Sequence, residues 1–405
     1  MNQRQLFLNH VAQTSPAPMG LEIERASGVY LYDTSGKKYL DLIAGISVSN
    51  VGHCHPRVVE AVQTQVQKYM HTLVYGEFVL TPQVQLAKLL TQHLPASLDC
   101  VYFTNSGTEA TEGAMKLAKR YTGRAKIVAC QKSYHGSSQG AMSLMSEAYF
   151  TDAYRPLLPQ IHHIRFNEAS DLQYIDETTA CVVMETVRAE IGVEVPKNDY
   201  LAQVKARCEA VGALLILDEI QVGCGRTGTL WAFEQYGVIP DILLLAKGLG
   251  GGMPLGAFVA NKAIMEAFTH NPVLGNLTTF GGHPVACAAA LASLQVLVSE
   301  AEWIGNVQQK SDYLKKTLQH PAILEVRAAG LLMAVEVASA PFVRAVIRRC
   351  VENGLITDWF LFNENALRIA PPLIISQSEL ESACSIVLEA IDYYHQSPHL
   401  VPPAY

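Results

Sequence analysis

The sequence is poor in charged residues and has no long run of basic ones. Only 17% of the 405 residues are Asp, Glu, Lys or Arg, and 30 basic against 37 acidic residues give a formal net charge of −7. Basic residues never extend beyond pairs such as Lys37-Lys38 and Arg348-Arg349. Because binding to the phosphate backbone of nucleic acids needs a clustered cationic surface, we expect no nucleic-acid partner.

Long apolar runs are also missing. Asp, Lys or Gly interrupts each apolar stretch before it reaches the ~18 residues that a membrane-spanning helix needs. Residues 1–18 contain no apolar block behind a basic patch, as a secretion signal would. The nine cysteines include no Cys-x-x-Cys pair, which favours free thiols in a reducing compartment. We therefore expect a cytoplasmic protein that neither enters a membrane nor is exported.

The rest of the composition is that of a large folded protein. Hydrophobic residues make up 49% of the chain, which excludes disorder and a coiled coil. The length suggests roughly two to three folding units with a substantial core. The low charged fraction leaves little polar surface to cover a monomer, and this favours a homo-oligomer with a buried interface.

Short apolar runs alternate with helical patterns through the middle of the chain. Ala110, Ala114 and Leu117 recur at helical spacing, as do Leu201 and Val204. The continuous hydrophobicity of the runs between them suits strands that are covered on both faces. This alternation predicts an α/β fold whose large domain has a mostly parallel central sheet flanked by helices. The predicted strands are 101–103, 127–129, 181–184, 214–217, 242–245 and 256–259.

A smaller α/β domain is expected at the C-terminal end. The pattern there predicts an Ala-rich helix at 286–298, strands at 331–337 and 367–375, and a closing helix at 379–393. We predict three parts: an N-terminal segment that packs with the small domain, a large domain that contains the central sheet, and the small domain itself. Their predicted bounds are 1–52, 53–290 and 291–405.

The polar residues at the ends of the predicted strands are the first candidates for a site, because ligands bind beyond the carboxyl ends of strands in an open α/β sheet. Asn105-Ser106-Gly107-Thr108-Glu109 follows one strand and opens a helix. Ser106 and Glu109 fit a simple capping box. Alternatively, Gly107 allows a close backbone approach, and the free N–H groups and hydroxyls bind a phosphate.

Two further strands end in a charged residue. Asp218 marks an exit to solvent or faces a cationic ring nitrogen, which is what a pyridoxal phosphate enzyme requires. Lys247 precedes the glycine-rich Gly248-Leu249-Gly250-Gly251-Gly252. A lysine at the end of a buried strand can lose its proton through desolvation and attack a carbonyl as a Schiff-base amine. A candidate phosphate-binding segment, a carboxylate that could pair with a pyridine nitrogen and a lysine that could form an imine thus follow one another at strand ends.

These residues follow one another in the order found in the class III aminotransferases, which the sequence resembles. That family belongs to the fold type I pyridoxal phosphate-dependent transferases and includes enzymes of the ornithine, acetylornithine and 4-aminobutyrate type. The resemblance extends over nearly the whole chain and is more specific for the family than for the substrate. It rests on the segments 52–56, 105–110, 134–136, 218–221, 225–228, 246–248, 279–282 and 368–372.

The resemblance implies pyridoxal 5′-phosphate as the cofactor and assigns the residues around it. Lys247 would form the imine, and Asp218 would pair with the pyridine nitrogen. Tyr134 would stack on one face of the ring and Val187 would support the other. Thr279 would reach the phosphate bound in the neighbouring subunit, which implies a homodimer with shared active sites. The remaining cofactor-binding residues implied are Ser106, Gly107, Thr108, His135, Glu185 and Gln221.

The resemblance also implies how one pocket accepts two kinds of substrate. Arg368 resembles the arginine that binds the α-carboxylate of 2-oxoglutarate or glutamate. Glu190 resembles the glutamate that pairs with this arginine while the amine donor is bound, and both count as catalytic or substrate-binding residues. Lys247, once released, would shuttle a proton to and from the substrate carbon.

Three positions depart from the family pattern. Ser137 stands where acetylornithine and 4-aminobutyrate enzymes commonly carry an arginine for the distal carboxylate. Arg188 stands where an amide is usual, and Ile46 replaces the aromatic residue of ornithine enzymes, which disfavours free ornithine. We hypothesise that Arg188 takes over the carboxylate-binding role of the missing arginine. The alternative is a structural or surface arginine.

These residues predict an ω-aminotransferase that moves the distal amino group of an acetylornithine-like donor to 2-oxoglutarate, giving glutamate and a semialdehyde. A 4-aminobutyrate or lysine donor is the first alternative. An epimerase or decarboxylase of the same fold is the second, and a non-catalytic phosphate- or nucleotide-binding protein is the third. His53-Cys54-His55 resembles part of a metal site, but the sequence offers no second group of ligands to complete it, so we expect no metal. Arg226 is expected to be a structural ion-pair partner.

Overall fold

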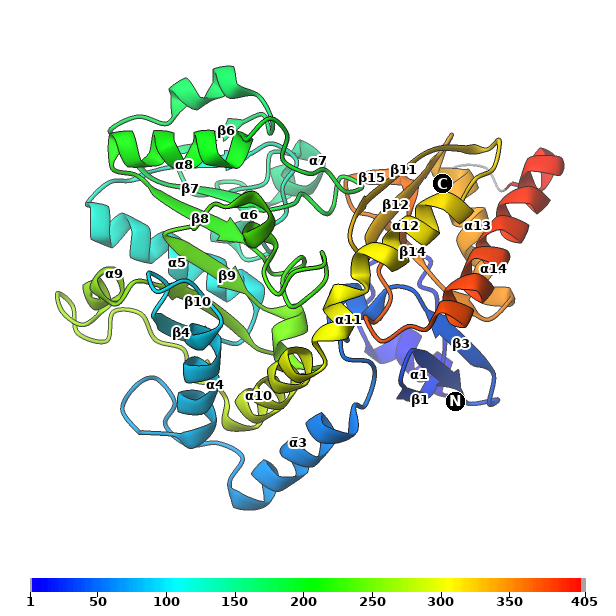
Figure 1. Ribbon diagram of the computed structural model, residues 1–405, viewed down its shortest axis with the longest axis horizontal. Helices are drawn as coiled ribbons and strands as arrows, with labels where there is room; N and C mark the ends of the chain where they lie inside the picture. Colours follow the sequence, from blue (N-terminus) through cyan, green and yellow to red (C-terminus); the bar gives the residue numbers. More distant parts are fainter. Residues whose placement is uncertain (1, 402–405) are drawn as a thin grey trace.

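The computed structural model describes residues 2–401, and the predicted strands of the middle region lie in one central sheet (Figure 1). The strand order is β4-β10-β9-β8-β7-β5-β6. The neighbours from β9 to β6 are parallel, whereas β10 is antiparallel to both β9 and β4. The mostly parallel sheet was therefore predicted correctly. Its strands are β4 (Cys100–Thr104), β5 (Lys126–Cys130), β6 (Ile161–Ile164), β7 (Thr179–Glu185), β8 (Leu214–Asp218), β9 (Ile242–Leu245) and β10 (Gly256–Ala260).

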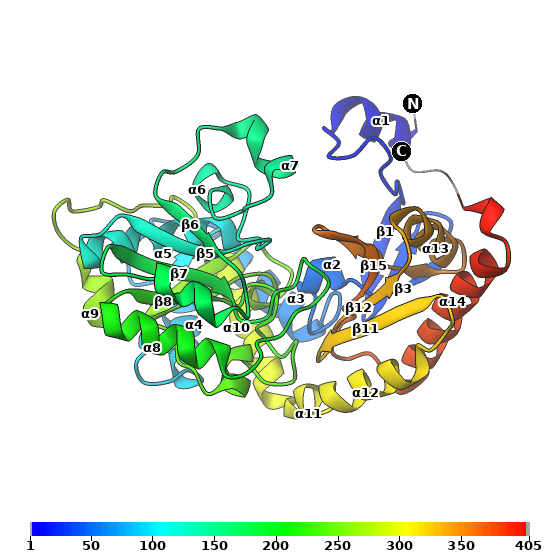
Figure 2. The ribbon, with the colours of Figure 1, turned by 90° about the horizontal axis from the view of Figure 1, so that it is seen from above.

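Helices cover both faces of this sheet because alternate strand residues point in opposite directions. Val182 and Met184 of β7 pack in one hydrophobic cluster with α8 (Tyr200–Val211). Cys181 and Val183 pack in another with α5 (Gly107–Thr122). Figure 2 shows α5 and α8 on opposite sides of the strands. The other helices of this part are α4 (Thr81–Gln92), α6 (Gln139–Met142), α7 (Ala148–Thr151) and α9 (Lys262–Met265).

A second, antiparallel sheet lies in the C-terminal part of the chain, reached through α10 (Pro284–Ser299), α11 (Ala301–Gly305) and α12 (Val307–Thr317) (Figure 2). The strand expected at 367–375 is wrong beyond Ile369, because Pro371 and Pro372 carry no N–H group for a strand ladder. The sheet order is β11-β12-β15-β14, with β11 (Ile323–Ala329), β12 (Leu332–Val337), β15 (Asn363–Ile369) and β14 (Asp358–Phe360), and the helices beside it are α13 (Ala340–Glu352) and α14 (Gln377–Gln396).

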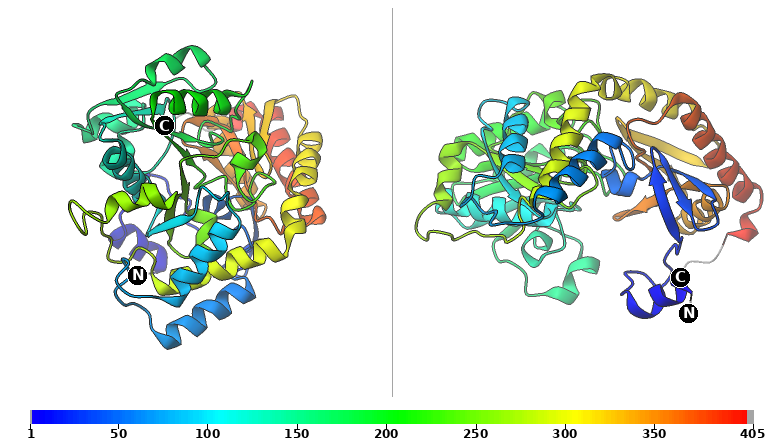
Figure 3. Two further views of the ribbon diagram at one scale, coloured as in Figure 1. Left: turned by 60° about the vertical axis from the view of Figure 1, so that its left-hand side comes forward. Right: turned by 90° about the horizontal axis from the view of Figure 1, so that it is seen from below.

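The N-terminal strands lie beside this C-terminal part. Leu40 and Asp41 of β3 pair in parallel with Leu355 and Ile356 of β13. Helix α1 (Gln3–His10) has no buried residue and projects from the body of the protein (Figure 3). The division at 52 and 290 stays a prediction, and its outer ends, residue 1 and residues 402–405, lie outside the described residues. The remaining elements are β1 (Ile23–Ser27), β2 (Tyr30–Asp33), β3 (Lys38–Asp41), β13 (Leu355–Ile356), α2 (Ala44–Ser47) and α3 (Pro56–Lys68).

No single helix between residues 2 and 401 is both long enough and apolar enough to cross a membrane. Only α10 together with Ala301–Thr317 reaches that length and composition, and the two segments are bent by 68° relative to one another. Most residues of α10 are buried in the core, which explains its apolar character.

Candidate active site

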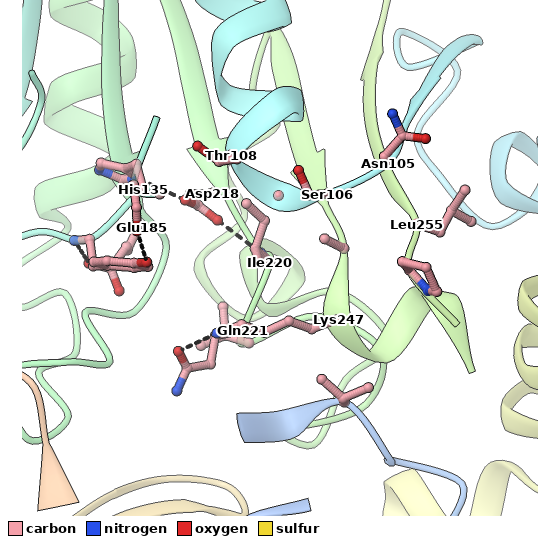
Figure 4. A pocket seen from close by; sticks show the side chains of 18 of the residues that line it. Asn105, Ser106, Thr108, His135, Glu185, Asp218, Ile220, Gln221, Lys247 and Leu255 are labelled. Atoms are coloured by element: carbon pink, nitrogen blue, oxygen red, sulfur yellow. Dashed lines mark hydrogen bonds and ion pairs between the residues drawn. The ribbon is translucent and has the colours of Figure 1, made fainter. Parts of the chain in front are cut away.

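The carboxyl ends of β4, β7, β8 and β9 meet around one cavity of about 560 Å³ (Figure 4). Strand β4 runs in the same direction as β9, because β10 is antiparallel to both. The residues that follow these strands therefore lie at one edge of the sheet. Six sequence-predicted residues are thereby brought together along the cavity wall: Ser106, Gly107, Thr108, Asp218, Gln221 and Lys247.

Lys247 follows β9 and holds a backbone conformation that is unusual for a residue with a side chain, with φ at 45°. Its Nζ donates a hydrogen bond to Oε1 of Gln221 at 2.9 Å, as Figure 4 shows. Burial lowers the pKa of the Lys247 amine, and the charge of Glu190 opposes this shift. The amine is therefore held closer to its neutral, nucleophilic form than a surface lysine.

Asp218 ends β8 and is only 4% exposed. Its Oδ2 lies 2.7 Å from Nδ1 of His135, and its Oδ1 accepts a hydrogen bond from the backbone N–H of Ile220 at 2.9 Å. Thr111 donates from Oγ1 to the carbonyl of His135, which fixes the backbone that carries the imidazole. The carboxylate is thus held in one orientation at the cavity wall.

The N-terminus of α5 forms the opposite end of the cavity. Ser106 caps the helix by accepting a hydrogen bond from the N–H of Glu109 at 3.3 Å. The expected capping box is incomplete, because the carboxylate of Glu109 accepts from the N–H of Asn105 at 2.7 Å and not from that of Ser106. Oγ1 of Thr108 lies 2.7 Å from Oγ of Ser138. A Cβ at Gly107 would lie 2.9 Å from Cδ1 of Ile220, so a side chain here would require Ile220 to shift. Hydroxyls and free helix N–H groups together make an anion-binding end of the cavity.

Three further predicted residues complete the walls. Val187 and Tyr134 both line the cavity. Glu185 accepts hydrogen bonds from the N–H of Ala189 at 2.8 Å and of Tyr134 at 3.3 Å. Burial raises the pKa of Glu185 to about 7, and nearby His135 opposes the shift.

An adjoining cavity of about 540 Å³ shares Lys247 and Tyr134 with the first. We call it the outer compartment. Arg368 lines it and pairs with Glu190, from Nη1 to Oε1 at 2.8 Å and from Nη2 to Oε2 at 3.0 Å. Ile46 lines the same compartment, as expected of a residue that faces substrate. The structure thus brings the arginine and glutamate of the resemblance within reach of Lys247.

Sequence reasoning missed Asp358, which lies on the other side of Arg368. Its Oδ1 is 3.0 Å from Nε of Arg368. Asp358 and Arg368 are register partners in the β14–β15 pair. No local pattern in the sequence indicated this placement, because the two residues face one another only through the register of β14 and β15.

Arg188 does not line either cavity, contrary to the hypothesis that it binds a carboxylate there. Its guanidinium donates to Oε2 of Glu194 at 2.7 Å and to the carbonyls of Gln131 and Lys132. The backbones of Arg188 and Glu194 also pair. These contacts engage the guanidinium in stabilising the 188–194 turn. Arg188 is therefore a structural arginine, which was the alternative to the carboxylate-binding hypothesis.

Ser137, which stands where the arginine is common, lines the inner cavity, and its Oγ lies 2.9 Å from the hydroxyl of Tyr134. Thr279 is exposed and does not line the cavities of its own chain. Arg226 is fully buried, but the expected ion pair was wrong for the part of the chain described. Its guanidinium donates instead to the carbonyls of Leu331 and Pro371 and to Oδ1 of Asn50.

The residues of the inner cavity fit pyridoxal phosphate. The N-terminus of α5 offers N–H and hydroxyl donors to a phosphate, Asp218 offers a buried carboxylate to a ring nitrogen, and Lys247 offers an amine to an aldehyde. Nε2 of Gln221 is buried and has no hydrogen-bond partner between residues 2 and 401. A buried donor without a partner is costly, and a bound polar group would satisfy it. Within the same range, no three His, Cys, Asp or Glu side chains are grouped to hold a metal ion.

Comparisons with known proteins agree with this geometry. The family model described as aminotransferase class-III matches residues 11–391. The acetylornithine aminotransferase of Methanopyrus kandleri is 38% identical over 90% of this chain and 92% of that protein. The putrescine aminotransferase of Pectobacterium atrosepticum is 39% identical over 91% of this chain and 81% of that protein.

Solved structures are similar over nearly the whole chain. The ornithine aminotransferase of Toxoplasma gondii, described with partial occupancy of pyridoxal phosphate in its active site, has a TM-score of 0.90 at 29% identity. That similarity covers 97% of this chain and 94% of the other. A transaminase from the marine bacterium Virgibacillus has a TM-score of 0.90 at 28% identity, with 97% and 99% covered.

The fold and the cavity therefore define a fold type I pyridoxal phosphate-dependent enzyme. Within that class, the chain belongs to the class III aminotransferase family. It is an aminotransferase that acts on small amino and oxo compounds.

Proposed function

We propose that the protein is an ω-aminotransferase of acetylornithine-like breadth, which moves a distal amino group to 2-oxoglutarate and gives glutamate and a semialdehyde. The observation that carries this proposal is the Arg368–Glu190 pair in the compartment that borders Lys247. A pocket that alternates between an amine donor and a 2-oxo acid needs a cation that can be both covered and exposed. A buried bidentate arginine–carboxylate pair provides one.

Pyridoxal phosphate, when bound, supplies an aldehyde that condenses with amines and a ring that accepts electrons. Thr108, Gly107 and Ser106 would hold its phosphate, and Asp218 would hold a proton on its ring nitrogen. Lys247 would hold its aldehyde carbon, and the free amine of Lys247 would carry the proton to and from the amine-bearing carbon of the substrate.

Several other residues orient these groups. His135 holds the Asp218 carboxylate, and Gln221 holds the Lys247 amine by accepting its hydrogen bond. Tyr134 and Val187, which line the inner cavity, would contact the two faces of the ring and exclude water from it. The carboxylate of Glu185 accepts hydrogen bonds from the backbone N–H groups of Tyr134 and Ala189, and this fixes the position of Tyr134.

The two half-reactions differ in the partner of Arg368. With the amine donor bound, Glu190 covers the guanidinium. With 2-oxoglutarate bound, Glu190 moves aside and Arg368 takes the α-carboxylate through the same two nitrogens. Ile46 lies on the substrate side of this compartment and disfavours free ornithine. A 4-aminobutyrate or lysine donor is the alternative within this reaction type.

The assembly is proposed to be a cytoplasmic homodimer. Thr279 is exposed in its own chain and would donate its hydroxyl to the phosphate held by the partner. The low charged fraction of 17% and the exposed Phe78, Val79 and Phe280 support a covered apolar surface. No nucleic acid or membrane takes part.

Stoichiometric formation of glutamate from an amine donor and 2-oxoglutarate tests the proposed reaction. The donor half-reaction can be followed separately as single-turnover bleaching of the cofactor absorbance. Release of carbon dioxide, or racemisation without an acceptor, would instead indicate a decarboxylase or an epimerase of the same fold. Absence of any cofactor absorbance would favour a non-catalytic phosphate-binding protein.

A further inference from the structure

The outer compartment carries an excess of carboxylates. Arg368 is paired on one side with both oxygens of Glu190 and on another side with Asp358, whose Oδ1 lies 3.0 Å from Nε. The other cation of the compartment is Lys247, whose amine is taken up by the cofactor under the proposed function. Two carboxylates then face one guanidinium, which leaves one negative charge uncompensated.

No other described side chain around the compartment supplies a cation. The remaining residues that line it are Gly45, Ile46, Tyr134, Trp359 and Leu361, and none of them is charged. Ser137 is bound to Tyr134, and Arg188 is held by Glu194 away from both cavities. A carboxylate at the far end of a donor would therefore find no cation other than Arg368, which it could bind only by displacing Glu190.

We infer that this compartment selects amine donors whose far end is positively charged, that is, α,ω-diamines, and that Asp358 is the residue that determines this specificity. The inference rests on the proposed aminotransferase reaction with its 2-oxo acid acceptor, and it replaces the acetylornithine-like donor, whose far end carries a carboxylate, with a diamine. A cationic far end adds to the compartment the charge that it lacks and leaves the Arg368–Glu190 pair intact. An anionic far end must displace a buried carboxylate from a bidentate pair.

The shape and chemistry of the walls suit an alkyl chain that ends in an ammonium group. Ile46 and Leu361 are apolar residues of the lining that can contact methylene groups, and the carbonyl of Trp359 accepts a hydrogen bond from Nη2 of Arg368 at 3.0 Å. Oδ1 of Asp358 lies 3.0 Å from Nε of Arg368 but is buried without a hydrogen-bond partner among residues 2–401, so the carboxylate can still accept a hydrogen bond. Burial raises the pKa of Asp358 to about 6, and the carboxylate is therefore mainly ionised at neutral pH.

Asp358 also positions Arg368 in the other half-reaction. When Glu190 moves aside for a 2-oxo acid, the ion pair with Nε remains and keeps the guanidinium in place. Asp358 and Arg368 are backbone register partners, so replacement by the isosteric amide leaves the β14–β15 pairing intact. Asp358→Asn therefore removes the charge without removing the shape.

The test compares three donors of equal length in single-turnover bleaching of the holoenzyme: 1,5-diaminopentane, pentylamine and 5-aminopentanoate. The far ends of these donors are cationic, neutral and anionic. We expect the apparent second-order rate constant for the diamine to exceed that for 5-aminopentanoate by at least about tenfold. In Asp358→Asn this ratio should fall to within about threefold. Glu364→Gln is the matched control, because this exposed carboxylate of β15 pairs with Arg344 outside the compartment.

A binding measurement gives a readout that is independent of turnover. Pentyltrimethylammonium is cationic and cannot react, so its dissociation constant for the holoenzyme can be measured by calorimetry. It should be about tenfold weaker for Asp358→Asn than for the wild type and unchanged for Glu364→Gln.

Two outcomes would overturn the inference while the proposed function stands. One is bleaching by 5-aminopentanoate as fast as by the diamine in the wild type. The other is a diamine preference that Asp358→Asn leaves unchanged. Bleaching by N-acetylornithine but by none of the three amines would also overturn the inference while the proposed function stands. Failure of N-acetylornithine and of all three amines to bleach the cofactor would reject the proposed function itself.

Discussion

Glu190 and Arg368 face one another through two hydrogen bonds, at 2.8 Å and 3.0 Å, although they are 178 residues apart in the chain. Nearby Arg368 keeps the pKa of Glu190 below its usual range even though burial acts in the opposite direction. The pair is therefore ionised, and it can open only when another anion replaces the glutamate.

Replacing Glu190 by Gln should separate the two half-reactions. Arg368 would lose its covering charge, so the donor half-reaction should slow by about tenfold or more, while the KM for 2-oxoglutarate should fall. Rapid mixing with the donor and with 2-oxoglutarate measures the two steps separately. Glu194→Gln, which breaks an ion pair outside the cavities, is the control. Equal losses in both half-reactions would be evidence against a switching role.

The Asp218–His135 pair predicts graded losses of activity. Asp218→Asn removes the charge that faces the ring nitrogen, and we expect kcat to fall by about a hundredfold or more. His135→Leu leaves the carboxylate but removes its orienting partner at 2.7 Å, so the loss should be smaller, about 10- to 100-fold. Steady-state kinetics with saturating cofactor measure both. A larger loss for His135→Leu than for Asp218→Asn would reverse the assigned roles.

Replacing Gly107 should weaken cofactor binding, and a second substitution at Ile220 should partly restore it. In Gly107→Ala the new methyl group would lie 2.9 Å from Cδ1 of Ile220 and would displace the phosphate-binding backbone. We expect the dissociation constant of pyridoxal phosphate to rise about tenfold or more. Adding Ile220→Val removes that Cδ1 atom and should restore part of the affinity in equilibrium dialysis. Unchanged affinity in the single variant would place the phosphate elsewhere.

Glu219 predicts a pH-dependent stability. It is buried beside the site and accepts hydrogen bonds from the N–H groups of Ala232 and Phe233. Burial raises its pKa from 4.5 to about 7. Between these values the folded protein binds more protons than the unfolded chain, so the free energy of unfolding falls as pH rises, by up to about 3 kcal/mol at pH 7 and above.

Urea unfolding at a series of pH values from 4.5 to 8 measures this contribution. Glu219→Gln should flatten the decline, whereas Glu389→Gln on the exposed face of α14 should leave it as in the wild type. Identical pH profiles for Glu219→Gln and the wild type would show that Glu219 does not titrate in this range.

Much of the central sheet and of the inner cavity was predictable because both follow from local patterns. Continuous apolar runs marked β7, β8 and β9, and parallel strands place their carboxyl ends at one edge. Asp218 and Lys247 therefore converge by topology alone. Edge strand β6, by contrast, was missed, since His162 and His163 interrupt its apolar run.

The outer compartment depends on contacts between distant segments, and there the sequence was less informative. The placement of Asp358 follows from the register of β14 and β15, which no local pattern specified. The orientation of the Arg188 side chain follows from the backbone bridge and the ion pair with Glu194, which direct it away from the cavities. A charged residue that lies near a site in the sequence can thus point into the cavity or away from it, and its orientation is set by tertiary packing.

The account depends most directly on the amine of Lys247. Borohydride reduction of the holoenzyme, followed by digestion and mass spectrometry, should find the pyridoxyl group on the peptide that contains Lys247 and on no other. A label on a different lysine, or no labelled peptide from enzyme that retains its cofactor, would contradict the account.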